Sequence, residues 1–370
     1  MFQPYFDFNT LYLYIAIGLC IVFFVRKYNN SDKKSIFLLV LFAILLVFSV
    51  SRKVDINLGG MDSIPYEQIF LNRDYGRLMD NNEFLFVYFT DIIREFTADP
   101  VIYRCFCYSL IVFSYIFFIK EFSPKNSSSA QYILVMYPLL MSFNTMRSSM
   151  AMAMILIGLV FLHRKKNIFG IAFIVSSVFF HRMSMIYLPV IPFYYLLRNV
   201  NVFRSKTFMV VTITIAMLAS SAVGTMFQGY ILSAGILDEN DLYYLGLNEG
   251  GMFTAAQAFF VPLLLISVFM IMNTNRKMFE EYKFLYLIVL YDIVIYPCTF
   301  VFGMWRANEY FYIPRLALWG ILLYTFYQRF DKRNRLLVKL IALVCFTFWF
   351  VDRLEGTYKT SALMPYVLNW

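Results

Sequence analysis

Apolar segments of about 15 to 20 residues recur along the whole chain, and this recurrence constrains the fold more than any motif. Segments of this length are close to what an α-helix needs to cross the hydrocarbon core of a bilayer. The strands of a transmembrane barrel would alternate apolar and polar residues instead, so the pattern excludes that architecture. The sequence therefore predicts an all-α polytopic membrane protein.

The composition supports lipid as the solvent. Hydrophobic residues make up 61% of the 370 positions and charged residues make up 15%. A soluble domain is typically about 45–50% apolar and about 25% charged. A water-soluble globule could not bury so many apolar side chains, which excludes a soluble enzyme, a nucleic-acid-binding module and a disordered tail.

The apolar runs predict about twelve transmembrane helices. The predicted spans are 10–25, 36–50, 101–119, 130–145, 148–162, 167–181, 183–197, 207–223, 254–272, 284–302, 310–327 and 336–351. Because no internal repeat and no linker divides the chain, we expect one transmembrane domain over residues 1–370.

The charged residues divide the loops into two sets. Six short loops contain 20 of the 32 Lys and Arg residues together with five acids. These basic loops are 26–34, 120–125, 164–166, 198–206, 276–283 and 329–339. Loops rich in Lys and Arg face the cytoplasm in most membrane proteins. We therefore expect the basic loops inside and both termini outside.

Two long segments are expected on the outer face. Residues 51–100 contain an amphipathic helix, because apolar side chains recur there at spacings of three or four residues. Its expected apolar face is Leu85, Phe89, Ile92, Ile93 and Phe96, and its expected polar face is Glu83, Asp91, Arg94 and Glu95. Such a helix is expected to lie in the plane of the membrane surface. Residues 224–253 are acidic without Lys or Arg, and both segments could cap an outward-facing cavity.

Ionisable residues at the outer ends of the spans are the candidates for chemistry, because charge at membrane depth is costly. Arg147 follows Asn144 at a junction between two spans, and its guanidinium could hold a phosphate. Its charge could equally extend to the membrane surface without a ligand. His181 and Arg182 lie at another outer junction. A histidine there could act as a base, donate to a phosphate, or be an interfacial residue satisfied by backbone or water.

A late span and the first outer loop provide further candidates. Arg306 and Glu309 mark the outer mouth of the late span, and Arg315 lies within it. Asp292 is expected at a similar depth, so a structural ion pair is the alternative to anion binding by Arg315. Asp62, in the first outer loop, could accept a proton from an attacking hydroxyl or could simply be solvated.

The sequence contains no HExxH motif, no Cys or His cluster, no DxD pair and no Gly-rich phosphate loop. Any catalysis is therefore expected to rest on arginine electrostatics and proton transfer. No metal ion, nucleotide or other cofactor is expected.

Taken together, the motifs resemble those of the EpsG family of polytopic membrane proteins, which overlaps the Wzy-type polymerases of O-antigen, capsule and exopolysaccharide. The resemblance rests on six elements: Asp62-Ser-Ile-Pro-Tyr66, the segment from Glu83 onward, Arg147 with the small residues Ser148 to Ala153, the basic turn His163 to Lys166, His181-Arg-Met-Ser184, and an arginine near Tyr310 and Phe311. Either Arg306 or Arg315 can match that last arginine.

The resemblance implies a GT-C-like glycosyltransferase on the outer face of the bacterial inner membrane. Members transfer a growing glycan from undecaprenyl diphosphate to the non-reducing end of a lipid-linked repeat unit. The implied partners are undecaprenyl-diphosphate-linked oligosaccharides and membrane lipids, with a flippase and a chain-length regulator as further candidates. No nucleic acid is implied.

Under this interpretation the candidate residues have three roles. His181 or Asp62 would accept the proton. The diphosphate would be held by Arg147, Arg306, Arg182 and Arg315, and the substrate would be positioned by Asn144, Tyr66, Ser184, Glu309 and Tyr310. Two alternatives stay open: another lipid-linked glycan transferase or ligase, and a flippase or transporter of lipid-linked oligosaccharide, which would also use buried charges.

Overall fold

The computed structural model describes residues 6–30, 34–55, 58–60, 62–122, 130–197, 281–292, 309–328 and 330–368. The chain forms two compact units: a first unit of Met1–Leu188 with Leu323–Trp370, and a second unit of Pro189–Leu322. Apart from two isolated bridges, every regular element in the described ranges is a helix, which confirms the all-α prediction. The predicted spans 207–223 and 254–272 and the acidic loop 224–253 lie outside the described residues.

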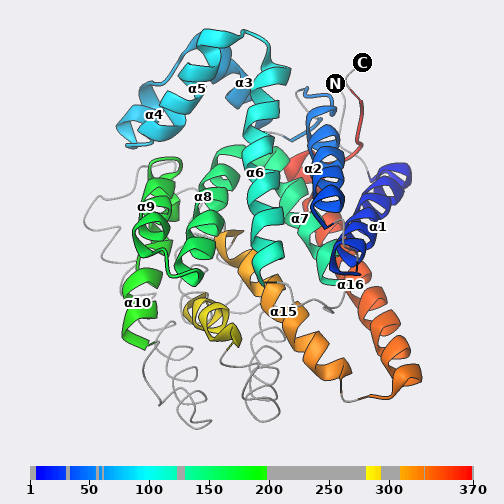
Figure 1. Ribbon diagram of the computed structural model, residues 1–370. Helices are drawn as coiled ribbons and strands as arrows, with labels where there is room; N and C mark the ends of the chain where they lie inside the picture. The colour runs from blue at the N-terminus through cyan, green and yellow to red at the C-terminus, as the bar shows by residue number, and fades with distance from the viewer. Residues whose placement is uncertain are drawn as a thin grey trace, which may run out of the picture. The chain divides into compact units, whose positions relative to one another are not determined.

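Long helices form the frame of the first unit (Figure 1). Helix α1 packs on α2 and α7, α2 also packs on α6, α7 packs on α16, and α8 contacts both α6 and α9. Their bounds are α1 Phe8–Asn30, α2 Lys34–Val50, α6 Pro100–Phe122, α7 Ala130–Asn144, α8 Met146–His163, α9 Asn167–Val178 and α16 Lys332–Ser361.

Four of the described helices, α1, α6, α8 and α16, are long and apolar enough to cross a membrane. Helices α2 and α9 are apolar but shorter. All six overlap predicted spans, because long apolar runs leave the helix as the only conformation that satisfies the backbone in lipid. The multi-pass character is thereby supported, whereas the total of about twelve spans stays a prediction.

Helix α8 is buried along most of its length, and a pair of glycines explains how α9 approaches it. A β-carbon added at Gly158 would lie 2.8 Å from the carbonyl oxygen of Gly170. One added at Gly170 would lie 2.9 Å from the carbonyl oxygen of Gly158. The two backbones therefore meet at this crossing, as small residues allow in membrane helix pairs.

The structure corrects the start of the predicted span 183–197. After α9 the backbone is extended at His181 and then forms a single 3₁₀ turn, η1 (Arg182–Tyr187), before α10 (Val190–Leu197) begins. Pro189, which lacks an N–H, stands immediately before α10, a position where the missing donor costs nothing. In the second unit the structure describes α10, helical residues 281–292 and the part of α15 (Tyr312–Tyr327) that precedes Leu323.

The segment between α2 and α6 folds into three helices at one end of the first unit (Figure 1). They are α3 (Ser63–Asn72), α4 (Gly76–Asp80) and α5 (Phe84–Phe96). Helix α5 is the expected amphipathic helix. Its position in the plane of the membrane surface stays a prediction.

The faces of α5 differ from the prediction. The buried side chains are Phe86, Val87, Thr90 and Ile93, whereas Ile92 and Phe96 are exposed. Apolar residues occupy both sides of this helix, so spacing alone did not identify the packed side. The placement of Glu83 on the solvated polar face is wrong, because Glu83 precedes the helix and is buried.

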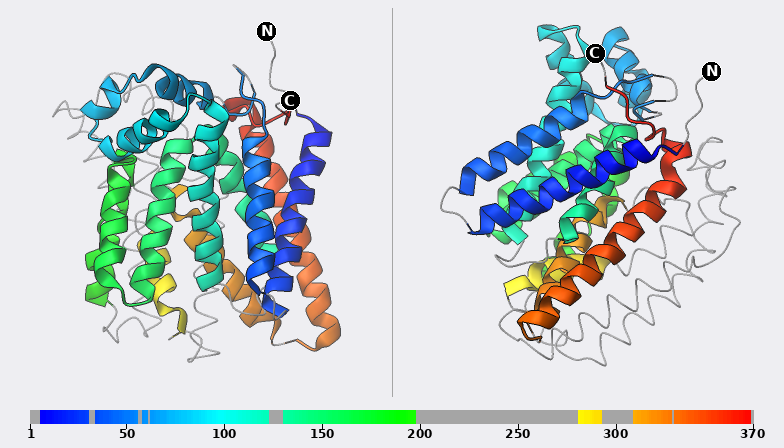
Figure 2. Two further views of the ribbon diagram at one scale, coloured as in Figure 1. Left: turned by 45° about the horizontal axis from the view of Figure 1, so that its top comes forward. Right: turned by 90° about the vertical axis from the view of Figure 1, so that its right-hand side faces the viewer.

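The first unit has two distinct ends. The site end is defined by residues 7–10, 48–55, 58–60, 62–63, 143–147, 179–184 and 362–368. Figure 2 shows the start of α1 and the C-terminal segment together there. The basic end is defined by residues 26–30, 120–122 and 163–166. At this end Arg164 and His163 both contact Glu121. Within the first unit the described basic loops thus lie opposite the candidate site.

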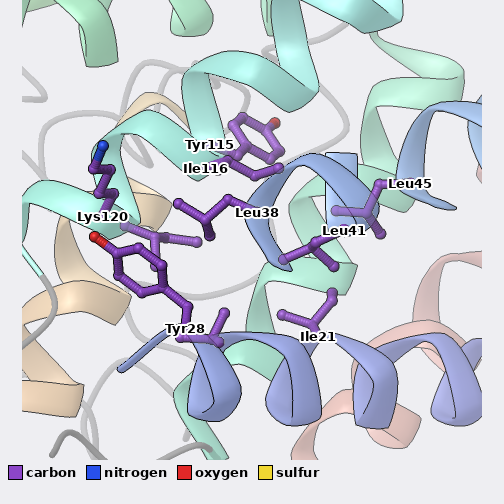
Figure 3. Close-up of a pocket in the computed structure, with 10 residues that line it drawn as sticks. Ile21, Tyr28, Leu38, Leu41, Leu45, Tyr115, Ile116 and Lys120 are labelled. Carbon is purple, nitrogen blue, oxygen red and sulfur yellow. The ribbon is translucent and has the colours of Figure 1, made fainter. Parts of the chain in front are cut away.

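Two cavities of the described part adjoin α1 and α2. One, of about 20 Å³, lies between α1, α2 and α6 and has Tyr28 and Lys120 at its rim (Figure 3). That volume suits about one water molecule. The other is an open apolar groove of about 800 Å³ along α1 and α2, next to Tyr366. Apolar linings of this kind suit acyl chains better than charged groups.

Candidate functional site

Arg52, which follows α2, is the anchor of the site end. Its guanidinium is fully buried and donates to the carbonyl oxygens of Ser49 and Gly59 and to the hydroxyls of Ser63 and Tyr108. It also lies 4.2 Å from the ring centroid of Phe143. A buried cation is tolerated only when its N–H groups are satisfied. Arg52 therefore fixes the loop after α2 against the α7–α8 junction.

The same loop brings Asp62 to Asn144. The Asp62 backbone N–H donates to Oδ1 of Asn144 at 2.9 Å, and the Ser63 hydroxyl donates to the carbonyl of Phe143 at 2.5 Å. Gly60 has a φ of +102°, and a β-carbon there would lie 2.1 Å from the Phe143 oxygen. Only glycine fits this conformation and approach. Two predicted site residues, Asp62 and Asn144, are thus neighbours.

Arg147 is the second residue of α8, three positions after Asn144, and faces an acid. Its Nη1 lies 2.6 Å from Oε2 of Glu83, whose side chain is 3% exposed, while the Arg147 side chain is 22% exposed. Among the described residues the buried Nε of Arg147 has no hydrogen-bond partner. An arginine with a free donor and a partly open side chain can still bind an anion.

Glu83 also reaches the junction that contains His181. Its Oε1 accepts a hydrogen bond from the Arg182 backbone N–H at 3.0 Å. Immediately after Glu83, the N–H groups of Leu85 and Phe86 both donate to the carbonyl of Phe179. The start of α5 consequently lies against the end of α9 and the start of α8 (Figure 2).

Burial is the dominant influence on the Glu83 carboxyl and raises its pKa above the ordinary value. The Arg147 guanidinium, the Arg182 N–H, and the charges of Arg182 and Arg77 oppose that shift. A buried carboxylate keeps its charge only where such partners replace water. Glu83 is thus a buried acid whose pKa is raised by burial and held down in part by arginines from three separate segments.

Ser184 is buried and Tyr66 is half-buried. The Ser184 hydroxyl is fully buried and bonded to the Ser177 hydroxyl at 2.9 Å. The Tyr66 ring packs edge-on against Phe86, with centroids 6.3 Å apart. Both contacts join elements around the site, and direct roles of Ser184 and Tyr66 towards substrate stay predictions.

The second unit contains the remaining described candidates. Arg315 donates through Nε and Nη2 to both oxygens of Asp292, each at 2.7 Å, and Asp292 is 2% exposed. The ion pair expected as the alternative for Arg315 is therefore present. Tyr310 is buried and Glu309 half-buried. Arg306 lies outside the described residues.

Sequence reasoning did not assign Glu83 or Arg52 to the site. Glu83 was noticed only as part of a family element, because its spacing suggested a solvated helix face. Arg52 was not predicted, since its partners are main-chain carbonyls and hydroxyls, which form no charge pattern in the sequence. A second cation, Arg104 of α6, is buried and paired with Glu67 of α3.

The described residues contain no group of three or more His, Cys, Asp or Glu side chains placed to hold a metal ion. The polar groups gathered at the site end are arginines, single carboxylates, hydroxyls and one histidine. Such a set can bind an anion and move a proton.

Comparison with known proteins identifies the family. No curated protein and no solved structure matches the chain. The model of the EpsG family matches residues 54–368, which include every candidate residue of both units. The resemblance inferred from the motifs is confirmed. The chain belongs to the EpsG family, a family of Wzy-like polysaccharide polymerases and exopolysaccharide biosynthesis proteins.

Proposed function

We propose that this protein is a metal-independent polysaccharide polymerase. It transfers a growing glycan from undecaprenyl diphosphate to the non-reducing end of a lipid-linked repeat unit, on the outer face of the inner membrane. Membership of the EpsG family supports polysaccharide polymerisation as the activity. The lipid carrier, the membrane face and the independence from metal belong to the proposal.

The proposed step is a displacement at the anomeric carbon of the donor glycan. The acceptor hydroxyl oxygen forms the new glycosidic bond as the bond from that carbon to the diphosphate oxygen breaks. The hydroxyl proton passes to His181 or Asp62, and undecaprenyl diphosphate leaves with the bonding electrons. Negative charge grows on the diphosphate, so a guanidinium beside it stabilises the transition state more than the ground state.

The observation that carries the proposal is the state of Arg147. Its guanidinium is held by Glu83 at one nitrogen, has a buried Nε free of hydrogen bonds within the described residues, and is partly open. Asp62 reaches the same junction through Asn144, and His181 through the Arg182 backbone and Glu83. An anion-binding group and two candidate bases thus belong to one connected cluster.

Several finer features are part of the same proposal. We keep about twelve spans, a GT-C-like arrangement and both termini outside. Arg182 and Arg306 are retained as further diphosphate ligands. Because Arg315 is already bound to Asp292, we propose that it acts on the diphosphate only if that pair opens. A flippase and a chain-length regulator are the proposed protein partners.

The test is polymerisation by purified protein in lipid nanodiscs supplied with undecaprenyl-diphosphate-linked repeat units. We expect a ladder of products that persists in EDTA. Arg147→Ala should lower the rate about 10²- to 10³-fold, the usual effect of removing one donor from a developing oxyanion. The matched control is Arg164→Ala, which removes an arginine bound to a glutamate at the basic end and should leave the rate unchanged.

Three results would contradict the proposal. Loss of the ladder in EDTA would show metal dependence. A single added unit would indicate another glycan transferase or ligase. Movement of lipid-linked oligosaccharide across vesicles of this protein without any polymer would indicate a flippase or transporter.

A further inference from the structure

We propose that Glu83 is a positioning residue that holds the Arg147 guanidinium in place for the diphosphate. This proposal rests on the proposed polymerase function. It assigns a role in the reaction to an acid that makes no contact with substrate. Arg147 makes the contact, and Glu83 acts through it.

The first argument is the geometry of the ion pair. The Glu83 side chain is almost completely buried, and its Oε2 lies 2.6 Å from Nη1 of Arg147. The opposite charges are thus in direct contact, yet Oε2 makes no aligned hydrogen bond in the described structure. The contact fixes one nitrogen of the guanidinium and leaves Nε without a partner among the described residues. A planar group held at one nitrogen presents its other donors in a fixed direction.

The second argument is that the carboxylate is itself held rigidly. Its Oε1 accepts a hydrogen bond from the Arg182 backbone N–H. The backbone N–H groups of Leu85 and Phe86, two and three residues after Glu83, donate to the carbonyl of Phe179. Glu83 therefore cannot shift without disturbing the α9–η1 junction. Rigid supporting groups of this kind determine how well a ligand-binding side chain is placed.

The third argument concerns the charge. An isolated buried carboxylate next to a diphosphate would repel it, but a carboxylate paired with arginine is neutralised locally. Because Glu83 contacts Nη1, the diphosphate would meet the donors on the other side of the guanidinium. Pairing also keeps Arg147 from extending towards the membrane surface when no substrate is bound.

The decisive variant is Glu83→Gln, because its amide oxygen can still accept from Arg182 while the charge facing Arg147 is lost. We expect kcat to fall about tenfold to 10²-fold, the scale of a misplacement of about 1 Å at a reacting group. The KM for the lipid-linked substrate should change little, since the lost interaction belongs to the transition state. Glu121→Gln is the matched control, because Glu121 binds Arg164 at the same 2.6 Å at the basic end.

A double-mutant comparison separates positioning from general stabilisation. If Glu83 acts through Arg147, adding Glu83→Gln to Arg147→Ala should lower kcat by less than about twofold further, because coupled residues are not additive. A purely structural residue would lower kcat by the same factor in both backgrounds. Glu83→Asp keeps the charge but moves the carboxylate away from Arg147 by one methylene, and we expect an intermediate kcat in the folded variant.

The outcomes are distinguishable from failure of the proposed function. If the wild-type protein makes no polymer, the polymerase proposal fails first. If it makes polymer and folded Glu83→Gln keeps the wild-type kcat, the positioning role is overturned. Equal losses in the wild-type and Arg147→Ala backgrounds would overturn it as well. Should Glu83→Gln not fold, Glu83→Asp decides, and wild-type kcat in that variant counts against the proposal.

Discussion

At the scale of single residues, the sequence pointed to Arg147 but not to its buried partner Glu83. Arg147 interrupts a run of small and apolar residues, so its charge needs an explanation wherever it lies. Glu83 sits beside a polar turn, where an acid is ordinarily solvated, and only the fold shows that it is buried against Arg147. Pairing across 64 positions of sequence depends on tertiary packing, which no local pattern encodes.

The buried state of Glu83 predicts a pH dependence of stability. Burial raises the pKa of this carboxyl despite Arg147, Arg182 and Arg77, so the folded protein binds the proton more tightly than the unfolded chain. The Glu83 contribution is therefore most favourable below its ordinary pKa and is lost as pH rises through the folded value. The melting temperature of the wild type minus that of Glu83→Gln should be largest below the ordinary glutamate pKa and should shrink as the pH rises through the raised pKa of the folded protein. A melting-temperature difference that grows with pH would contradict the raised pKa of Glu83.

At the scale of elements, apolar runs located the described helices well but did not resolve their breaks or faces. Helices α1, α2, α6, α8, α9 and α16 all overlap predicted spans. The 3₁₀ turn after His181 was not predicted, because residues 183–188 are as apolar as a helix would be. The packed face of α5 was predicted only in part, since both sides of that helix are apolar.

The α8–α9 crossing gives a prediction at this scale. Gly158→Ala would place a methyl group 2.7 Å from the Ile174 side chain and 2.8 Å from the Gly170 oxygen. We expect a loss of about 1–3 kcal/mol in the free energy of unfolding, the usual cost of overpacking. Gly76→Ala is the control, because nothing lies within 4 Å of a β-carbon at Gly76. The melting temperatures of the two variants in detergent test this prediction. If Gly158→Ala melts at the same temperature as Gly76→Ala, α9 can move away from α8 without cost.

At the scale of the whole molecule, charge distribution was the most informative property of the sequence. The described basic loops of the first unit and the candidate site lie at opposite ends, as expected if the site faces away from the cytoplasm. The fold of residues 198–280 and the position of Arg306 lie outside the described residues. Apolar runs predict helices there but not their partners, because lipid-facing and protein-facing sides are similarly apolar.

The orientation can be tested with reporter fusions. Alkaline phosphatase joined after Trp370 should be active and green fluorescent protein at the same position should be dark, because the C-terminal segment belongs to the site end. Fusions after Lys165, at the basic end, should show the reverse. Fluorescence after Trp370 together with phosphatase activity after Lys165 would invert the proposed topology.

The contacts of residues 362–368 have a consequence for biogenesis. The carbonyls of Ala362 and Val367 accept from Gly60 and Lys53, and the Leu363 carbonyl accepts from Tyr14. These acceptors lie about 300 or more residues after their donors in the sequence, so the ribosome synthesises them much later. In a nascent chain that lacks residues 362–368, the loop that contains Asp62 has none of these hydrogen bonds. Truncated translation products should therefore insert their helices normally yet remain inert.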